Sequence, residues 1–381
     1  MAVPLNIPLS LYVHVPWCIK KCPYCDFNSH VQNEPPWRDY VDALLVDLEK
    51  EYASCAGRQI ETIFFGGGTP SLMPGEAFGD LMRGIGARVE MDPECEITLE
   101  ANPGSVDADN FNAYYEAGVN RLSIGAQSFR NKQLALLGRV HKVDAIMKTY
   151  LVAQSIGFEN LNIDLMHSLP NDTTDGALSD LKQAIALRPK HLSWYELTIE
   201  SGTGFEKKPP LRPDHEQIIE QHELGIDTLA MAEYQRYEVS AFAQAGFECK
   251  HNLNYWQFGD YIGIGAGAHG KITTNDSVYR TEKRLNPMSY LKGVVHDDHA
   301  KPQRPLAKSD LITDFMINAF RINRGFTSDL FETRTGLSFD EIAEQLTVAR
   351  EKKLINCSEG VVLPTEHGLR FLNDLQLLFY T

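Results

Sequence analysis

Short apolar runs alternate with longer amphipathic stretches over about the first half of the chain. The apolar runs have the length of β-strands, and they are Leu9–Val15, Ile60–Phe65, Glu96–Glu100, Arg121–Gly125, Leu161–Leu165 and His191–Leu197. The amphipathic stretches carry apolar residues at helical spacing, and they are Trp37–Tyr52, Asp107–Ala117, Val143–Ile156 and Ala177–Leu187. Such alternation predicts parallel strands joined by right-handed helical crossovers. Six units of this kind favour an α/β fold with an incomplete (β/α)6 barrel, although a doubly wound open sheet has the same periodicity.

The pattern changes after residue 200. Gly202–Pro213 is rich in Pro, Gly and Lys and is typical of a linker, and it is followed by a predicted helix at His215–Ala232 and a predicted strand at Arg236–Phe242. From about residue 305 the pattern is mainly helical, with a hairpin-like segment at Val361–Thr365, which resembles a small winged-helix unit. We therefore expect a partial barrel over 1–235, a connecting segment over 236–304 and a small helical domain over 305–381.

Composition and charge narrow the class of protein. The 381 residues are 43% hydrophobic, which is ordinary for a globular protein. No apolar run approaches the roughly 20 residues of a membrane-spanning helix, and no signal peptide is visible, so we expect a soluble cytoplasmic protein. The formal net charge of -15 argues against a nucleic-acid partner, because phosphate binding needs clustered Lys and Arg.

Three cysteines lie close together after the first predicted strand. Cys18, Cys22 and Cys25 have the spacing C-x3-C-x2-C, whereas the other four cysteines are scattered. A zinc site would need a fourth ligand, for which His14 or His30 are the neighbours, but their spacing matches no common zinc pattern. A disulfide with a spare thiol is typical of secreted proteins. Three thiolates can instead hold a 4Fe-4S cube and leave one iron open for an external ligand.

A glycine-rich motif follows the second predicted strand. The segment Gly66–Pro70 reads GGGTP, and its three glycines lack a Cβ, so that backbone groups can approach a ligand closely. It lacks the G-x-x-x-x-G-K-[ST] pattern of a P-loop. In β/α barrels the loops after the strands build the active site, so the GGGTP loop and the cysteine loop are expected at the same mouth.

Together these two motifs resemble those of the radical S-adenosylmethionine superfamily. The resemblance implies a 4Fe-4S cluster held by Cys18, Cys22 and Cys25, with its open iron bound to the methionine end of S-adenosylmethionine. The order and spacing of further residues are similar to the oxygen-independent coproporphyrinogen III dehydrogenase group. By that resemblance the S-adenosylmethionine site comprises Tyr12, Tyr24, Gly67, Gly68, Thr69, Glu100, Gln127, Arg139 and Asp164. Glu100 would hold the methionine end, and Tyr24 would pack near the adenine. Gln127, Arg139 and Asp164 would face the ribose or the carboxylate of the cofactor.

Two departures from the dehydrogenases affect the expected function. Their fourth cysteine, in C-x3-C-x2-C-x-C, is replaced here by Phe27, and only 17 residues precede Cys18. The loop at Cys25–His30 and the HNLNYW segment at His251–Trp256 resemble the HemW family of haem chaperones instead. This resemblance implies binding of haem and its transfer to acceptor proteins. Oxidative decarboxylation of coproporphyrinogen III is the alternative, and radical chemistry on an unrelated substrate is a third reading.

Several histidines are candidates for the axial ligand of haem. Histidine is a common axial ligand of haem, and His251 is the first candidate because Tyr255 and Trp256 lie near it in sequence. His14, His167 and His269 are further candidates, although His251 and each of these three could equally be a hydrogen-bonded structural histidine. The expected partners are haem, haem-accepting respiratory proteins that are met transiently at the membrane side, and an electron donor such as flavodoxin or ferredoxin.

Overall fold

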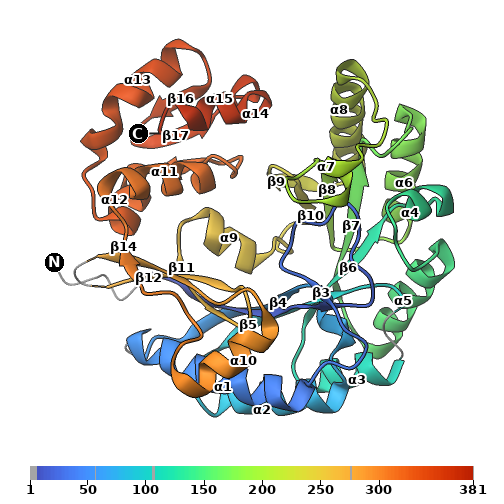
Figure 1. The fold of residues 1–381 in the computed structure, drawn as a ribbon. Helices are drawn as coiled ribbons and strands as arrows, with labels where there is room; N and C mark the ends of the chain where they lie inside the picture. The colour runs from blue at the N-terminus through green and yellow to red at the C-terminus, as the bar shows by residue number, and fades with distance from the viewer. Residues whose placement is uncertain (1–6, 56, 105–107, 275–276, 381) are drawn as a thin grey trace.

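The computed structural model describes residues 7–55, 57–104, 108–274 and 277–380. Within these residues the main sheet has 12 strands in the order β14-β13-β12-β11-β1-β4-β5-β6-β7-β8-β10-β9. Six of its neighbouring strands run parallel and match the six predicted runs: β1 (Leu9–Val15), β4 (Ile60–Gly67), β5 (Met91–Ala101), β6 (Arg121–Gln127), β7 (Asn160–His167) and β8 (His191–Glu196). The sheet curves without closing, because its two edge strands, β14 and β9, do not pair with each other (Figure 1). The predicted incomplete barrel is confirmed.

Helices cover the outer face of this sheet. They are α1 (Trp37–Tyr52), α2 (Gly75–Gly86), α3 (Ala108–Glu116), α4 (Asn131–Leu136), α5 (Val143–Ile156), α6 (Thr174–Ala186) and α8 (His215–Met231). The helices α1 and α5 have the predicted bounds. The predicted start of α3, at Asp107, lies outside the described residues. Leu44 and Leu48 on α1, like Leu181 on α6, are fully buried, so the apolar stripe of each helix faces the sheet.

The sheet extends beyond the six predicted strands at both edges. The strand β11 (Asp260–Ile264) adds parallel to β1, and β12 (His269–Thr273), β13 (Val278–Glu282) and β14 (Arg304–Pro305) continue antiparallel. At the other edge, the predicted strand at Arg236–Phe242 is in fact two strands, β9 (Gln235–Glu238) and β10 (Ala241–Ala243). The chain turns at Val239 and Ser240, so the prediction of one continuous strand was wrong there.

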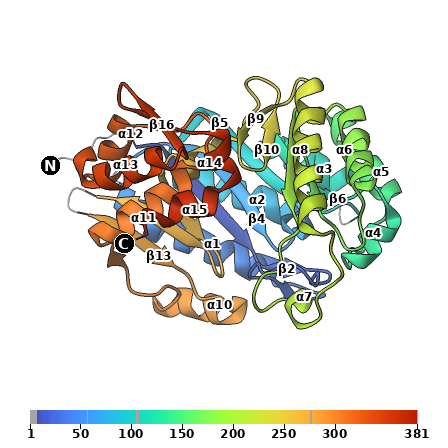
Figure 2. The same cartoon turned by 90° about the horizontal axis from the view of Figure 1, so that it is seen from above.

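Two short helices and a strand pair surround the mouth of the barrel. The HNLNYW segment forms α9 (Lys250–Trp256), which packs against β1 and β4 on the side of the sheet opposite α1 and α2 (Figure 1). The cysteine loop connects β2 (Trp17–Cys18) to β3 (His30–Val31), and these two strands pair. The helix α7 (Gly204–Lys207) lies beside this loop (Figure 2), and the Phe205 N–H donates to the Pro23 carbonyl at 2.8 Å.

The C-terminal residues form a unit with its own core. It contains α11 (Lys308–Ala319), α12 (Ser328–Thr335), α13 (Ala343–Glu351), α14 (Glu366–Arg370), α15 (Leu372–Leu377) and a three-stranded sheet of β15 (Phe326–Thr327), β17 (Val361–Pro364) and β16 (Ile355–Ser358). Phe315, Phe326 and Phe331 pack edge to face in its centre. Helices with a small β-ribbon fit the predicted winged-helix-like character. The helix α10 (Pro287–His296) lies between β13 and β14 in the chain and packs against α1. Among the described residues, no helix combines the length and apolar composition that crossing a membrane requires.

Candidate functional site

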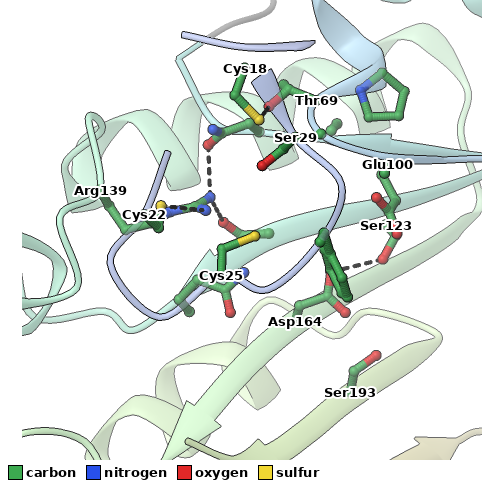
Figure 3. A pocket seen from close by; sticks show the side chains of 18 of the residues that line it. Cys18, Cys22, Cys25, Ser29, Thr69, Glu100, Ser123, Arg139, Asp164 and Ser193 are labelled. Carbon is green, nitrogen blue, oxygen red and sulfur yellow. Dashed lines mark hydrogen bonds between the residues drawn. The ribbon is translucent and has the colours of Figure 1, made fainter. Parts of the chain in front are cut away.

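A cavity of about 280 Å³ lies at the carboxyl ends of the parallel strands, where the resemblance predicts the cofactor site. Figure 3 shows the three cysteines on one side of it and Glu100, Ser123 and Asp164 on the other. Its walls come from the cysteine loop, the loop after β4, the ends of β5 to β8 and one residue of α9. The structure therefore brings the two sequence motifs into one site.

The cysteine loop presents three reduced thiols to this cavity. Cys18, Cys22 and Cys25 all line it, and each is a free cysteine, so the disulfide alternative gains no support. The Cys25 N–H donates to the Cys22 carbonyl at 3.2 Å, and the Thr69 hydroxyl donates to Cys18 Sγ at 3.4 Å. Burial raises the pKa of both the Cys18 and the Cys25 thiol, so a bound cation would be needed to keep these thiolates ionised.

The arrangement of the thiols fits a cluster better than a single metal ion. Among the described residues, no three His, Cys, Asp or Glu side chains converge closely enough to hold one ion. A 4Fe-4S cube does not require such convergence, because each thiolate binds a different corner. His14, one proposed fourth zinc ligand, uses both ring nitrogens in hydrogen bonds to the Tyr12 hydroxyl and the Asn28 carbonyl. His30, the other, has Nε2 within 3.1 Å of Asn28 Oδ1.

The glycines of the GGGTP loop are required by close packing against the first strand. Gly67 has φ of +114°, and a Cβ there would lie 2.5 Å from the His14 ring. A Cβ at Gly68 would lie 2.6 Å from the Trp17 carbonyl oxygen. Any side chain would therefore push the loop away from the cysteines. Thr69, which follows directly, is held close enough to reach Cys18.

Two carboxylates, Glu100 of β5 and Asp164 of β7, give the cavity an anionic wall. Asp164 accepts hydrogen bonds from the Ser123 hydroxyl and from Asn162 Nδ2, both at 2.8 Å. Glu100 lies nearby, and burial together with the charge of Asp164 raises its pKa to about 8, against a smaller opposing effect of the Gly67 N–H. The wall therefore suits a ligand with a cationic group, which would favour the ionised form of Glu100.

Arg139 and Gln127 complete the predicted set, and their side chains lie beside Gly125 of β6. Arg139 Nη2 donates to Asn102 Oδ1 and to the Gly125 carbonyl, both at 2.8 Å, and Nη1 lies 3.5 Å from the Tyr24 hydroxyl. Gln127 occupies a left-handed backbone conformation with φ of 71°, where the pairing of β6 with β7 shifts register. Its Oε1 accepts from the Tyr195 hydroxyl at 2.8 Å.

Tyr12 is set apart from the other predicted S-adenosylmethionine residues. Tyr24, Gly67, Gly68, Thr69, Glu100, Gln127, Arg139 and Asp164 all line the cavity with the cysteines. Tyr12 instead lines a neighbouring cavity, which shares Gly67 and Glu100 with the first. Burial raises its pKa well above the usual value, with Glu100 as the next cause, so the phenol is neutral.

His251, the first candidate for haem ligation, is enclosed by the fold. Its ring is 1% exposed and stacks on Phe64 with centroids 5.0 Å apart. Nδ1 is hydrogen-bonded to Thr62 Oγ1 at 2.7 Å, and burial lowers the pKa of the ring to about 3. Nε2 is buried and has no hydrogen-bond partner among the described residues. Haem could reach that nitrogen only after α9 had moved.

Further polar residues that the sequence motifs did not single out also line the cavity, among them Arg121, Ser123, Asn162, Ser193 and Tyr195. Arg121 is 2% exposed, and no acidic side chain of the described residues lies within ion-pair distance of it. The signal that could have found Arg121 is the alternation along β6, where Arg121, Ser123, Gly125 and Gln127 share one face.

Comparisons with known proteins show the family to which the chain belongs. A family model described as "Radical SAM superfamily" matches residues 12–184, and one described as "HemN C-terminal domain" matches residues 306–371. The chain is 47% identical to "Heme chaperone HemW" of Escherichia coli (strain K12), over 98% of each chain. It is 44% identical to the Haemophilus influenzae protein of the same name, over 100% of both chains.

A solved structure shows the same fold over the whole chain. It is the radical SAM enzyme coproporphyrinogen III oxidase (HemN) of Escherichia coli, with a TM-score of 0.84 and 24% identity. The similarity covers 100% of this chain and 92% of that one. The curved sheet, the three-cysteine loop and the full-length sequence matches lead to one conclusion: the chain belongs to the heme chaperone HemW family of the radical SAM superfamily.

Proposed function

We propose that this protein binds haem and passes it to acceptor proteins, while it carries a 4Fe-4S cluster and S-adenosylmethionine. The observation that carries the proposal is the identity of 47% with a protein named heme chaperone, over 98% of both chains. A whole-length match of this kind includes the cavity, the helix α9 and the C-terminal unit together. The fold by itself would not suffice, because one fold can host several chemistries.

The cysteines and the surrounding wall define where the resident groups would bind. Cys18, Cys22 and Cys25 would hold the cluster, and the eight residues of the cavity wall named above would hold S-adenosylmethionine. When bound, the pair supplies a one-electron reductant beside a sulfonium. Glu100 would release its proton as the cationic amino group binds, and Arg139 would orient the carboxylate.

The rim of the cysteine loop supports a docking role for an electron donor. Ile19 and Phe27 expose 51% and 60% of their surface there, next to Lys20 and Lys21. Apolar side chains beside cations suit a small acidic redox protein such as flavodoxin or ferredoxin. We place the protein in the cytoplasm, where thiols stay reduced, and propose respiratory proteins at the membrane side as haem acceptors.

A second candidate function is the oxidative decarboxylation of coproporphyrinogen III. The likeness in fold to coproporphyrinogen III oxidase favours it. The replacement of the dehydrogenase group's fourth cysteine by Phe27 favours the carrier.

One anaerobic experiment separates the two functions. The cluster is reconstituted, haem is titrated while the Soret band is followed, and coproporphyrinogen III is assayed for turnover in the same preparation with reductant and S-adenosylmethionine. Saturable binding of about one haem per chain without turnover is expected. Decarboxylated product formed at a catalytic rate, without saturable haem binding, would replace the carrier by the enzyme.

Replacement of one cysteine tests the cluster assignment. We expect Cys22→Ser to lose most of its iron and acid-labile sulfide after reconstitution, because two thiolates do not hold the cube firmly. Cys357→Ser is the matched control, since Cys357 is exposed in the C-terminal unit. Iron and sulfide contents of the Cys22 variant equal to those of the control would refute the assignment.

A further inference from the structure

A second cavity of about 660 Å³ lies directly against the cysteine loop. Its volume is within the roughly 300–1,000 Å³ typical of sites for drug-sized ligands. We call it the His269 groove and define it by the residues Tyr12, Phe27, Tyr255, Tyr261, His269 and Leu285. These residues come from the first strand, the cysteine loop, α9 and the added strands β11 and β12, together with the segment after β13. The groove is thus formed where the barrel meets its extension.

The walls of the groove are largely aromatic and aliphatic, and Asp26 and Glu100 are its acidic residues. Phe27 and Leu285 are 60% and 55% exposed at its rim, which leaves two large apolar side chains in water. Deeper inside, the rings of Tyr255 and Tyr261 lie 4.3 Å apart between centroids, at an angle of 61°. A flat apolar ligand placed between Phe27 and this tyrosine pair would remove the exposed surface from water.

His269 provides the groove with an unoccupied imidazole. It is the first residue of β12, where its backbone pairs with Glu282 of β13. Its side chain is exposed, and neither ring nitrogen has a hydrogen-bond partner among the described residues. The other two histidines that line the groove differ, because His14 uses both nitrogens and His30 is bonded to Asn28. His269 can therefore bind a metal without breaking an existing bond.

The groove also has a cation for an acidic substituent. Lys21 lines the rim, and its ammonium donates to the Phe27 carbonyl at 3.1 Å, which holds the charge beside the aromatic wall. The described residues offer no acidic partner to Lys21 within ion-pair distance. An apolar macrocycle with carboxylates at its edge would match the walls and the lysine at once.

We propose that haem binds in the His269 groove, with His269 as an axial ligand of the iron and with Phe27 against the porphyrin face. This proposal rests on the proposed haem-carrier function and names its binding site. It also gives a role to Phe27, the residue that stands where the dehydrogenases have a fourth cysteine. The haem would lie beside the cluster cavity, since the two cavities share Lys21, Phe27 and Glu100 in their walls.

The test compares two probes, haem and metal-free protoporphyrin, in the reconstituted full-length protein. His269→Ala should weaken haem binding about tenfold or more and change the Soret position, while protoporphyrin binding stays within about twofold, because protoporphyrin has no iron to ligate. Added imidazole should restore the original Soret band in this variant. Phe27→Ala should weaken both probes by about fivefold, because it removes stacking and not ligation.

His296→Ala is the matched control for the loss of an exposed histidine, since His296 ends α10 outside the groove. Wild-type affinity and an unchanged Soret band in His269→Ala would overturn the proposal. So would loss of the ligation signature in His251→Ala with its retention in His269→Ala, which would assign the ligand to α9. If the wild-type protein itself fails to bind haem saturably, the proposed function fails first, and this inference falls with it.

Discussion

At the scale of single residues, Glu100 gives the cavity a measurable dependence on pH. Burial and the charge of Asp164 raise its pKa to about 8 in the folded chain, against an ordinary value near 4.5. Between these two values the folded state binds a proton that the unfolded state has released, so this group lowers the free energy of unfolding as pH rises. The effect is at most about 1.4 kcal/mol per pH unit.

We therefore expect Glu100→Gln to lose less stability than the wild type as pH rises from 5 to 8. Well above pH 8 the difference in stability between the two proteins should stay constant, because Glu100 is then ionised in both the folded and the unfolded state. Urea unfolding of both proteins across that range measures the difference between their free energies of unfolding at each pH. The contributions of the buried histidines cancel in this difference, because both proteins contain them. Glu94→Gln is the control, because Glu94 is exposed on the same strand. Parallel stability curves for wild type and Glu100→Gln would show that Glu100 is ionised in the empty cavity.

Gly67 tests the close packing of the GGGTP loop. We expect Gly67→Ala to destabilise the fold by about 1–3 kcal/mol beyond its control, because the new Cβ meets the His14 ring at 2.5 Å. Gly202→Ala is the control, since Gly202 also has positive φ, at +80°, but a Cβ added there would have no atom within 4 Å. Equal losses of unfolding free energy in the two variants would mean that backbone strain, and not the contact with His14, makes the glycine necessary.

The sequence predicted the cavity residues that have fixed places in motifs, and it missed those that depend on strand orientation. Eight of the nine predicted S-adenosylmethionine residues line one cavity with the cysteines. Arg121 and Asn162 were missed because their side chains enter the cavity from within strands, where only the register decides which face is inward. The burial of His251 could not be foreseen either, since it depends on Phe64 and Thr62 of a distant strand.

At the scale of elements, one buried carboxylate holds the first residues of α9 against the barrel. Glu96 of β5 is 6% exposed and accepts from the backbone N–H groups of Lys250 and His251, at 3.2 and 3.1 Å. Cys249 Sγ donates to the same carboxylate at 3.5 Å. These contacts fix the start of α9 and so place Asn252 in the cluster cavity and Tyr255 in the His269 groove.

We expect Glu96→Ala to cost about 1–3 kcal/mol, because it leaves the buried His251 N–H and the part-buried Lys250 N–H without this acceptor. Hydrogen exchange should accelerate at residues 250–256 before the rest of the protein is affected. Glu94→Ala, two residues earlier and exposed, should change neither quantity. Unchanged exchange rates in Glu96→Ala would mean that the other contacts of α9, such as Asn254 Nδ2 to Ser10 Oγ at 2.8 Å, are sufficient.

The strands that the sequence did not predict lack a local periodicity. The five residues of β11 are all buried, and their glycine content resembles a loop, so their pairing with β1 is decided by tertiary contacts. The turn at Val239 and Ser240 that divides β9 from β10 carries no Gly or Pro, which are the residues that usually announce a break. The helices α1, α5 and α8 were predicted closely because an apolar stripe is a local signal, but α2 was missed although Phe78, Leu81, Met82 and Ile85 form such a stripe on it.

At the scale of the whole molecule, buried ion pairs stabilise the extension of the sheet and join it to the barrel. Lys271 of β12 donates to Asp260 of β11 at 2.8 Å, and both side chains are at most 1% exposed. Lys283, which follows β13, lies 2.6 Å from Asp47 and 2.5 Å from Glu51 on α1. Lysine is seldom fully buried, so sequence patterns alone place it on the surface. The packing of the groove-forming extension is therefore what the sequence could not reveal.

The Lys283 network should be a major determinant of global stability. Burial opposes ionisation of Asp47, but hydrogen bonds from His299 and Lys283 together with the lysine charge hold the pKa of Asp47 below its usual value. Lys283→Met would leave Asp47 and Glu51 buried without their cation. We expect a loss of about 3–5 kcal/mol of unfolding free energy at neutral pH, measured by urea denaturation.

The control for this variant is Lys50→Met. Lys50 lies on α1, the helix that carries Asp47 and Glu51. Lys50 pairs with Asp297 at 2.8 Å, but the two side chains are 38% and 81% exposed, so the expected change is about 0–1 kcal/mol. The loss in Lys283→Met should shrink as pH falls through the pKa of Asp47, because a protonated acid no longer needs the cation. A loss as small as that of Lys50→Met would mean that water enters beside α1, and the extension would then be held mainly by strand pairing between β1 and β11.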